Sequence, residues 1–310
     1  MVLRALAVAA TVGMFLVLVM GATVTNTGSA QGCGQSWPLC NGRLVPEFTV
    51  ATAIEYSHRA VTGMEGILVV ALAAAALLRS RAREVKLLVA LMLGFLLLQA
   101  GLGAWAVLAP QSPLVLASHF GISLIALASV FLTAVWSFQT PRPDQPLPSS
   151  YRWTVVGLTA YVLGVVYLGA YVRHTGVSLA CADWPLCNGQ AWPGFDGPAG
   201  VVFAHRLAAL GAVLLLAWLA AWSWRLRSTA PELWVGSLAA FALCLAQALS
   251  GALVVWTRLG LFGTLAHAAI VSVLFASLAF LARRVVLGGR RARVTQDTGR
   301  ARPAAAGAPP

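Results

Sequence analysis

The chain has 310 residues, of which 59% are hydrophobic and only 10% are charged, and its mean hydropathy is +0.82. Soluble globular domains carry about 25% charged residues, so this composition argues against a water-soluble protein. A formal net charge of +12 is compatible with nucleic-acid binding. The basic residues follow the loop asymmetry of a membrane protein, however, so we expect no nucleic-acid partner.

Eight apolar stretches are long enough to cross a bilayer, since a helix needs about 20 apolar residues to span a hydrocarbon core of about 30 Å. The first stretch is followed by small residues, Thr27-Gly28-Ser29-Ala30, that a signal peptidase accepts. Its apolar run exceeds the about 7 to 15 residues of a signal core, so we expect a retained span. The predicted spans are residues 5–24, 51–78, 87–108, 114–138, 153–172, 199–224, 233–256 and 260–282.

The basic residues predict the orientation of these spans. Cytoplasmic loops are enriched in Lys and Arg, and sixteen of the 21 basic residues fall on the side that holds both termini, which are therefore predicted to be cytoplasmic. The other five are Arg43, Arg59, Arg173, Arg206 and Arg258. The Arg- and Pro-rich tail, residues 286–310, is predicted to be disordered and to contact anionic membrane lipid.

The chain is internally duplicated. The sequence Trp-Pro-Leu-Cys-Asn-Gly at 37–42 recurs unchanged at 184–189, an offset of 147. Further matches at offsets of 147 or 148 are His58-Arg59 with His205-Arg206, Gln99 with Gln247, Gly103 with Gly251, and His119 with His267. We therefore predict an all-α integral membrane fold of eight helices in two pseudo-symmetric, parallel-repeat four-helix bundles, residues 1–139 and 153–285, joined by a cytoplasmic linker at 140–152.

Four of the five histidines occupy equivalent places in the repeat, about five to seven residues inside the outer end of each even-numbered span. That spacing puts His58 level with His119, and His205 level with His267, at a depth of roughly 8 to 10 Å. Facing helices of a bundle are where cofactor sites are built, and two imidazoles at equal depth suit axial ligation of a haem. A lone histidine is more often a hydrogen-bonded core residue, but four at matched depths favour haem ligation.

The halves differ in their carboxylates. Glu55 lies three residues before His58 and Glu65 seven after it, on the same helical face, while Val202 and Ala212 stand at the equivalent places. Chemistry is therefore expected in the first half and simple haem binding in the second. Glu55 as an ion-pair partner of Arg59 or Arg206, and Glu65 as a structural hydrogen-bonding residue, are the alternatives. Arg59 and Arg206 either bind haem propionates or place their charge at the outer interface.

The cysteines form two short-spaced pairs in the predicted outer loops, Cys33 with Cys40 and Cys181 with Cys187. Local disulfides are feasible in an oxidising compartment. A structural role ranks ahead of a redox role because neither pair has the spacing of redox motifs. Cys244 is expected to be a buried thiol, and His174, whose counterpart is Asn26, lies outside the repeated histidine set.

Together these residues resemble the haem A synthase family, integral membrane enzymes of eight helices in two similar halves. The resemblance covers nearly the whole chain. It rests on Glu55-Tyr56-Ser57-His58-Arg59, the two Trp-Pro-Leu-Cys-Asn-Gly loops, His119, His205-Arg206 and His267.

The resemblance implies oxidation of a methyl group of haem O to a formyl group, which gives haem A for cytochrome c oxidase. It implies that His58 and His119 flank the substrate haem, that His205 and His267 ligate a haem b cofactor, and that Glu55 is catalytic. It makes Cys33 and Cys40 a functionally relevant pair. Haem O synthase, an electron-transfer protein and a second copy of this chain are the partners considered.

Three other classes remain as alternatives at this point. A di-haem b-type electron-transfer cytochrome needs the same four histidines and leaves the porphyrin unmodified. A parallel-repeat transporter calls for helices broken at mid-membrane, which the sequence does not indicate. A thiol-disulfide exchanger depends on the outer-loop cysteines.

Overall fold

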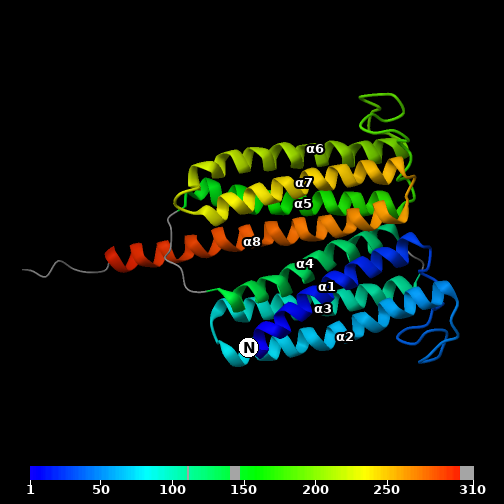
Figure 1. Ribbon diagram of the computed structural model, residues 1–310, viewed down its shortest axis with the longest axis horizontal. Coiled ribbons are helices and arrows are strands. Elements are labelled where there is room, and N and C mark those ends of the chain that lie inside the picture. Colours follow the sequence, from blue (N-terminus) through cyan, green and yellow to red (C-terminus); the bar gives the residue numbers. More distant parts are fainter. Residues whose placement is uncertain (110–111, 140–146, 301–310) are drawn as a thin grey trace, which may run out of the picture.

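The computed structural model describes residues 1–109, 112–139 and 147–300, with side chains as far as residue 287. Across these residues the chain forms long helices that lie roughly side by side (Figure 1). They are α1 (Val2–Asn26), α2 (Val50–Arg79), α3 (Arg83–Leu108), α4 (Pro113–Phe138), α5 (Ser149–His174), α6 (Gly197–Ser223), α7 (Pro231–Trp256) and α8 (Leu261–Arg300), with a short 3-10 turn, η1 (Trp224–Leu226), after α6.

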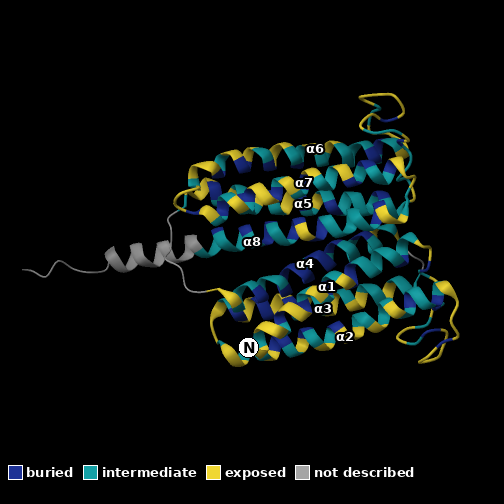
Figure 2. Ribbon diagram, in the orientation of Figure 1, coloured by how far each residue is buried: buried dark blue, intermediate teal, exposed yellow. Residues whose placement is uncertain are grey.

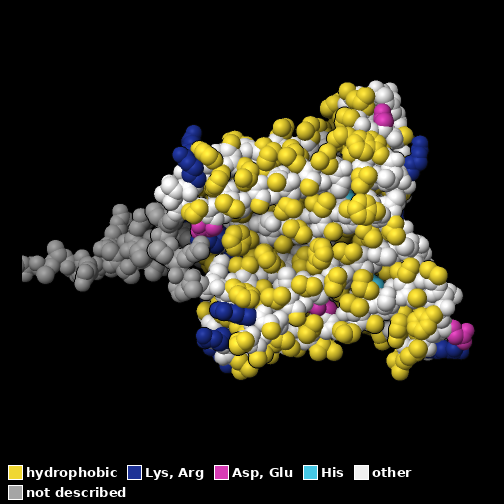
Figure 3. All heavy atoms as spheres, in the orientation of Figure 1, with side chains coloured by type: hydrophobic (Ala, Val, Ile, Leu, Met, Phe, Trp, Pro, Cys, Tyr) yellow, Lys and Arg dark blue, Asp and Glu magenta, His cyan; other side chains and the backbone are white. Residues whose placement is uncertain are grey.

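Within the described residues, eight helices are long and apolar enough to cross a membrane, which confirms the predicted all-α membrane fold. Figure 3 shows hydrophobic side chains over most of the visible face, with Lys and Arg gathered at its two ends. Several helices start earlier than predicted because local signals favour it. Thr49 caps α2 by accepting a hydrogen bond from the Thr52 amide, and Pro113 and Pro231 occupy first turns, where proline fits.

In the described part of the chain, the helices are held together mainly by the two larger clusters of buried apolar side chains. The first draws on α1 to α4 and the second on α5 to α8, and buried residues form stripes along the inward helix faces (Figure 2). The two groups of helices also contact each other, since α8 packs on α1 and α4, and α4 packs on α5. Val271 and Phe275 of α8 belong to the first cluster.

The ends of the two predicted domains differ from expectation. α5 begins at Ser149 and so takes up part of the predicted linker, residues 140–152, of which 140–146 lie outside the described residues. α8 continues to Arg300 instead of giving way to a disordered tail at 286. The physical reason is that no proline interrupts the chain between Leu261 and Pro303, and the arginines of this segment favour helix. Residues 301–310 lie outside the described residues.

Both long loops emerge at the same end of the bundle (Figure 1). They follow α1 and α5, and the two loops share the same local backbone features. Each contains a cis Trp-Pro bond, 37–38 and 184–185, and an asparagine with positive φ, Asn41 at 51° and Asn188 at 54°. A short β-bridge closes each turn, from Cys40 to Arg43 and from Cys187 to Gln190. The identical hexapeptide therefore encodes an identical turn in both halves.

Candidate functional site

The four repeated histidines lie near the end of the bundle that carries the loops. His58 and His205 come eight residues after the starts of α2 and α6, and His119 and His267 come six after the starts of α4 and α8. At about 1.5 Å per residue these depths are roughly 12 and 9 Å. The depth of His58 and His205, about 12 Å, exceeds the predicted depth of roughly 8 to 10 Å because α2 and α6 begin earlier than expected.

Each of these imidazoles packs against a glycine of the preceding helix. The contact is described by the distance from a Cβ atom built on each glycine to Cε1 of the histidine that it faces. In the first half this distance is 3.3 Å for Gly21 and His58 and 3.3 Å for Gly103 and His119. In the second half it is 2.6 Å for Gly169 and His205 and 3.4 Å for Gly251 and His267. Gly21 and Gly169 are equivalent at an offset of 148, as are Gly103 and Gly251. The duplication thus preserves a histidine-glycine contact four times, and the glycines give the rings their room.

Three of the four histidines have a ring nitrogen without a hydrogen-bond partner. Nδ1 of His58, His119 and His205 is buried without a hydrogen-bond partner, and a buried polar atom in that state calls for a further binding partner. His58 and His119 are close enough to interact electrostatically, as are His205 and His267. The pairing predicted from the repeat is therefore compatible with the positions of the rings.

A glutamine holds the fourth-helix histidine in each half. Nε2 of Gln99 lies 3.2 Å from Nε2 of His119, and Nε2 of Gln247 lies 3.0 Å from Nε2 of His267. Ser250 Oγ lies 2.9 Å from Nδ1 of His267. An amide N–H that points at a ring nitrogen takes up its lone pair. Iron ligation through Nε2 would therefore replace the glutamine contact.

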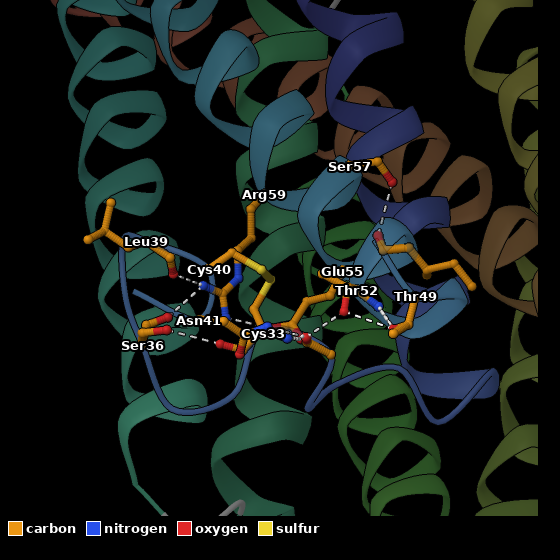
Figure 4. The surroundings of a disulfide bond; sticks show 12 residues. Cys33, Ser36, Leu39, Cys40, Asn41, Thr49, Thr52, Glu55, Ser57 and Arg59 are labelled. Carbon is orange, nitrogen blue, oxygen red and sulfur yellow. Dashed lines mark hydrogen bonds and ion pairs between the residues drawn. A yellow bond between two sulfur atoms is a disulfide. The ribbon is translucent and has the colours of Figure 1, made fainter. Parts of the chain in front are cut away.

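Glu55 is tied to the disulfide loop of the first half (Figure 4). Its Oε2 accepts a hydrogen bond from the backbone N–H of Cys33 at 2.8 Å, and its Oε1 pairs with Arg59 at 2.5 Å. The side chains of Arg59 and Glu55 are only 15% and 5% exposed. The sequence allowed Glu55 either a chemical role or an ion pair with Arg59 or Arg206. The ion pair with Arg59 is observed. The carboxylate oxygens keep further lone pairs for another donor.

The Arg59 guanidinium also holds the loop itself. Nη1 donates to the carbonyl oxygens of Ser36 at 2.7 Å and Leu39 at 2.9 Å, which lie inside and around the ring closed by the disulfide (Figure 4). Arg59 therefore connects α2, the loop and Glu55.

In the second half, the equivalent Arg206 binds the loop but has no carboxylate partner at the place of Glu55. Arg206 donates to the carbonyl oxygens of Leu186 and Cys181, but Val202 supplies no carboxylate at the place of Glu55. Asp183, at the place of Ser36, instead accepts from the backbone amides of Gly189 at 2.7 Å and Asn188 at 2.5 Å. Hydrogen bonds from these two amides lower the pKa of the Asp183 carboxyl, and the bond from Gly189 has the larger effect.

The cysteine pairs are confirmed as disulfides. Cys33 and Cys40 have Cα atoms 4.4 Å apart, and Cys181 and Cys187 have Cα atoms 4.5 Å apart. Cys244 is a buried free thiol, as expected. The two disulfides close the loops whose carbonyl oxygens accept hydrogen bonds from Arg59 of α2 and Arg206 of α6.

Two features near the sites were missed by sequence reasoning. His174 of α5 is close enough to His119 to interact with it electrostatically, although it belongs to the other half. Its neighbour Arg173 donates to Asn26 at 3.0 Å and to the Thr25 carbonyl at 3.2 Å, so it joins the end of α5 to that of α1. The glycines opposite the histidines are the other feature, and the offset of 148 was the available signal for Gly21 and Gly169.

A crevice of about 620 Å³ lies away from these residues, between α1, α4, α7 and α8. Val8, Phe131 and Phe280 line it together with the charged residues Arg284 and Glu232, and none of the histidines is among its lining residues. Among the described residues, no group of three or more His, Cys, Asp or Glu side chains is placed to hold a bare metal ion.

Fold and sites together define a polytopic helical membrane protein with a glycine-backed histidine pair in each half. Residues 46–279 match the family model described as cytochrome oxidase assembly protein (COX15-CtaA). The haem A synthase of Halalkalibacterium halodurans is 42% identical over 278 residues, which cover 87% of this chain and 92% of that protein. The haem A synthase of Symbiobacterium thermophilum is 42% identical over 299 residues, 93% and 97% of the two chains.

The haem A synthase of Bacillus licheniformis is 41% identical over 287 residues, which cover 90% of this chain and 94% of that one. This chain therefore belongs to the haem A synthase family of cytochrome oxidase assembly proteins. It is an enzyme of a haem-associated family, and its several membrane-spanning helices make it a multi-pass membrane protein.

Proposed function

We propose that this chain is a haem A synthase of the cell membrane, an oxidoreductase that converts a methyl group of haem O to a formyl group. Both termini lie in the cytoplasm and the histidines lie toward the extracytoplasmic face. The distribution of basic residues supports this orientation, because cytoplasmic loops are enriched in Lys and Arg. Haem O synthase would deliver the substrate, and an electron-transfer partner would accept the electrons.

One observation carries the proposal. Both halves repeat a histidine pair backed by glycines, yet only the first half adds a carboxylate beside the pair, Glu55. A protein that only transferred electrons between two haems would have no need for this difference. The asymmetry favours one reacting haem and one resident haem.

In the proposal, residues 1–139 hold haem O between His58 and His119, and residues 153–285 hold haem b between His205 and His267. The glycine contacts support both sites, and so do the unpartnered Nδ1 atoms of His58, His119 and His205, while both ring nitrogens of His267 are hydrogen-bonded. Haem b, when bound, supplies one-electron transfer. Arg59 and Arg206 directly follow a proposed ligand histidine in the sequence, and in the proposal their remaining N–H groups bind the propionates.

Glu55 would handle protons at the reacting methyl carbon. Oxidation of a methyl group with water to a formyl group releases electrons and protons in equal number, through an alcohol and a geminal diol that loses water. A fixed carboxylate beside the carbon accepts such protons. Cys33 and Arg59 hold Glu55 in place from opposite oxygens, which limits its rotamers without filling its lone pairs.

Haem analysis of a Glu55→Gln variant tests this function. Expressed in a host that makes haem O but lacks its own synthase, the parent protein should yield haem A. Glu55→Gln should accumulate haem O while keeping its haem b, because the substitution removes the proton acceptor and leaves the four histidines intact. Glu47→Gln, which alters an exposed ion pair on the same loop, is the matched control.

Two outcomes would count against the proposal in different ways. No haem A from the parent protein would reject the synthase and favour a di-haem electron-transfer cytochrome. Undiminished haem A from Glu55→Gln would reject the role of Glu55 alone.

A further inference from the structure

Glu65 is a buried carboxyl group that the proposed mechanism does not use. It lies at the middle of α2, fifteen residues after Val50, and is only 3% exposed. It shares the inward stripe of that helix with Glu55 and Val69. Its Oε1 atom is buried and has no hydrogen-bond partner. Ionisable groups at this depth are costly in a bilayer and are usually functional.

The facing helix is shaped around this carboxyl. A Cβ atom on Gly13 of α1 would overlap Oε2 of Glu65, so glycine at this position leaves room for the carboxyl group in its observed rotamer. The second half reverses the sizes, with Tyr161 in the place of Gly13 and Ala212 in the place of Glu65. The Tyr161 hydroxyl donates to the Ala208 carbonyl at 2.9 Å. The second half thus has no buried carboxyl at this place, and the partly exposed Tyr161 bonds the α6 backbone instead.

Glu65 lies on the inner side of the first histidine. It follows His58 by seven residues, two turns, so it sits about 10 Å deeper on the same face. Glu55 and Arg59 lie toward the loop end instead. In a haem with its propionates toward Arg59, the opposite porphyrin edge points to the depth of Glu65. Haem O carries a hydroxyl-bearing isoprenoid chain on that edge, where protohaem has a vinyl group.

We propose that Glu65 recognises the hydroxyl group of this isoprenoid chain and so selects haem O over protohaem in the first half. The inference rests on the proposed function. A hydroxyl group can donate to a carboxylate or accept from a carboxylic acid, so the contact forms in either protonation state. The second half, with Ala212 in place of the carboxyl, offers no such partner and accepts protohaem.

A purely structural carboxyl does not account for the arrangement. A buried carboxyl with a structural role has its oxygens hydrogen-bonded. Glu65 has an unsatisfied oxygen. The neighbouring helix α1 has a glycine, Gly13, at the point where the Glu65 carboxyl group lies against it.

Binding titrations test the proposal independently of turnover. Haem O and protohaem are titrated separately into the detergent-solubilised full-length protein with its second-half haem in place. Glu65→Leu should weaken haem O binding about 10-fold, the worth of one buried hydrogen bond, and leave protohaem binding unchanged. Glu65→Gln, which keeps hydrogen-bonding groups, should recover most of the affinity. Ser129→Ala is the control, because Ser129 is equally buried but bonds its own helix at Ile125.

A second variant guards against a folding failure. Gly13→Tyr combined with Glu65→Ala installs the two residues that the second half has at the equivalent positions, Tyr161 and Ala212, and it should bind haem O no better than protohaem. Equal weakening of both porphyrins by Glu65→Leu, or a preference for haem O that survives in the double variant, would overturn the proposal. A parent protein that prefers haem O but makes no haem A would instead overturn the proposed function and leave the role of Glu65 standing.

Discussion

Replacing Gly169 by alanine should selectively disrupt the second-half histidine pair. The new Cβ atom would lie 2.6 Å from Cε1 and 3.1 Å from Nε2 of His205. Ordinary contact begins at 3.4 Å, so the ring must move by 3.4 − 2.6 = 0.8 Å. Overpacking of this kind costs about 1 to 3 kcal/mol. A displaced axial ligand should also lower haem affinity in that half.

The assay is haem content per purified protein, by extraction and spectrum, together with the thermal unfolding midpoint. Gly169→Ala should lose haem b and keep the first-half haem. Two matched variants sharpen the comparison. Gly164→Ala on the same helix meets nothing within 4 Å, and Gly251→Ala meets His267 at an ordinary 3.4 Å. Both should retain haem b. Full haem b in Gly169→Ala would refute the idea that the glycine makes room for the ligand.

Three further predictions concern the loops. Arg59→Lys should cut haem A yield and lower the unfolding midpoint, because an ammonium group cannot reach both loop carbonyls and Glu55 in one geometry; unchanged yield would contradict this. Serine in place of Cys33 and Cys40 should destabilise the protein by about 2.5 kcal/mol, the chain-entropy value for so short a loop, and dithiothreitol should shift the midpoint of the parent more than that of the variant, which keeps only the Cys181–Cys187 bridge. Asp183→Asn should lower the unfolding midpoint at neutral pH.

The last of these effects has a defined pH dependence. The amides of Gly189 and Asn188 lower the pKa of Asp183 in the folded state. The carboxylate therefore stabilises the loop above its ordinary pKa, near 3.8, and this contribution is lost as the pH falls through the lowered folded value. The parent and Asp183→Asn midpoints should differ at pH 6 and converge in strong acid. A difference that grows on acidification would contradict this sign.

The eight spans and the paired loops could be predicted from the sequence because bilayer thickness and duplication are strong constraints. A span needs a fixed length of apolar chain, and the recurring hexapeptide located the loops. The four histidines followed from the same repeat. Helix ends were less certain, since α8 runs to Arg300 where a disordered tail was predicted.

Contacts between separate helices were beyond reach. No local pattern indicates that Gly13 faces Glu65 or that Gly169 faces His205, because these contacts depend on how helices rotate against one another. The same holds for the bond from the Cys33 amide to Glu55, which joins residues 22 positions apart. Glu55 was identified as special by its absence from the second half, while its restraint by the loop required the three-dimensional structure.

The central claim is that each half holds one haem between its own two histidines. Its most direct test is the pigment content of the purified protein with alanine at His58, His119, His205 or His267. Loss of haem b only with the last two, and of haem O or haem A only with the first two, is the predicted result. Loss of both pigments from every variant, or of neither from any, would contradict separate histidine-paired sites.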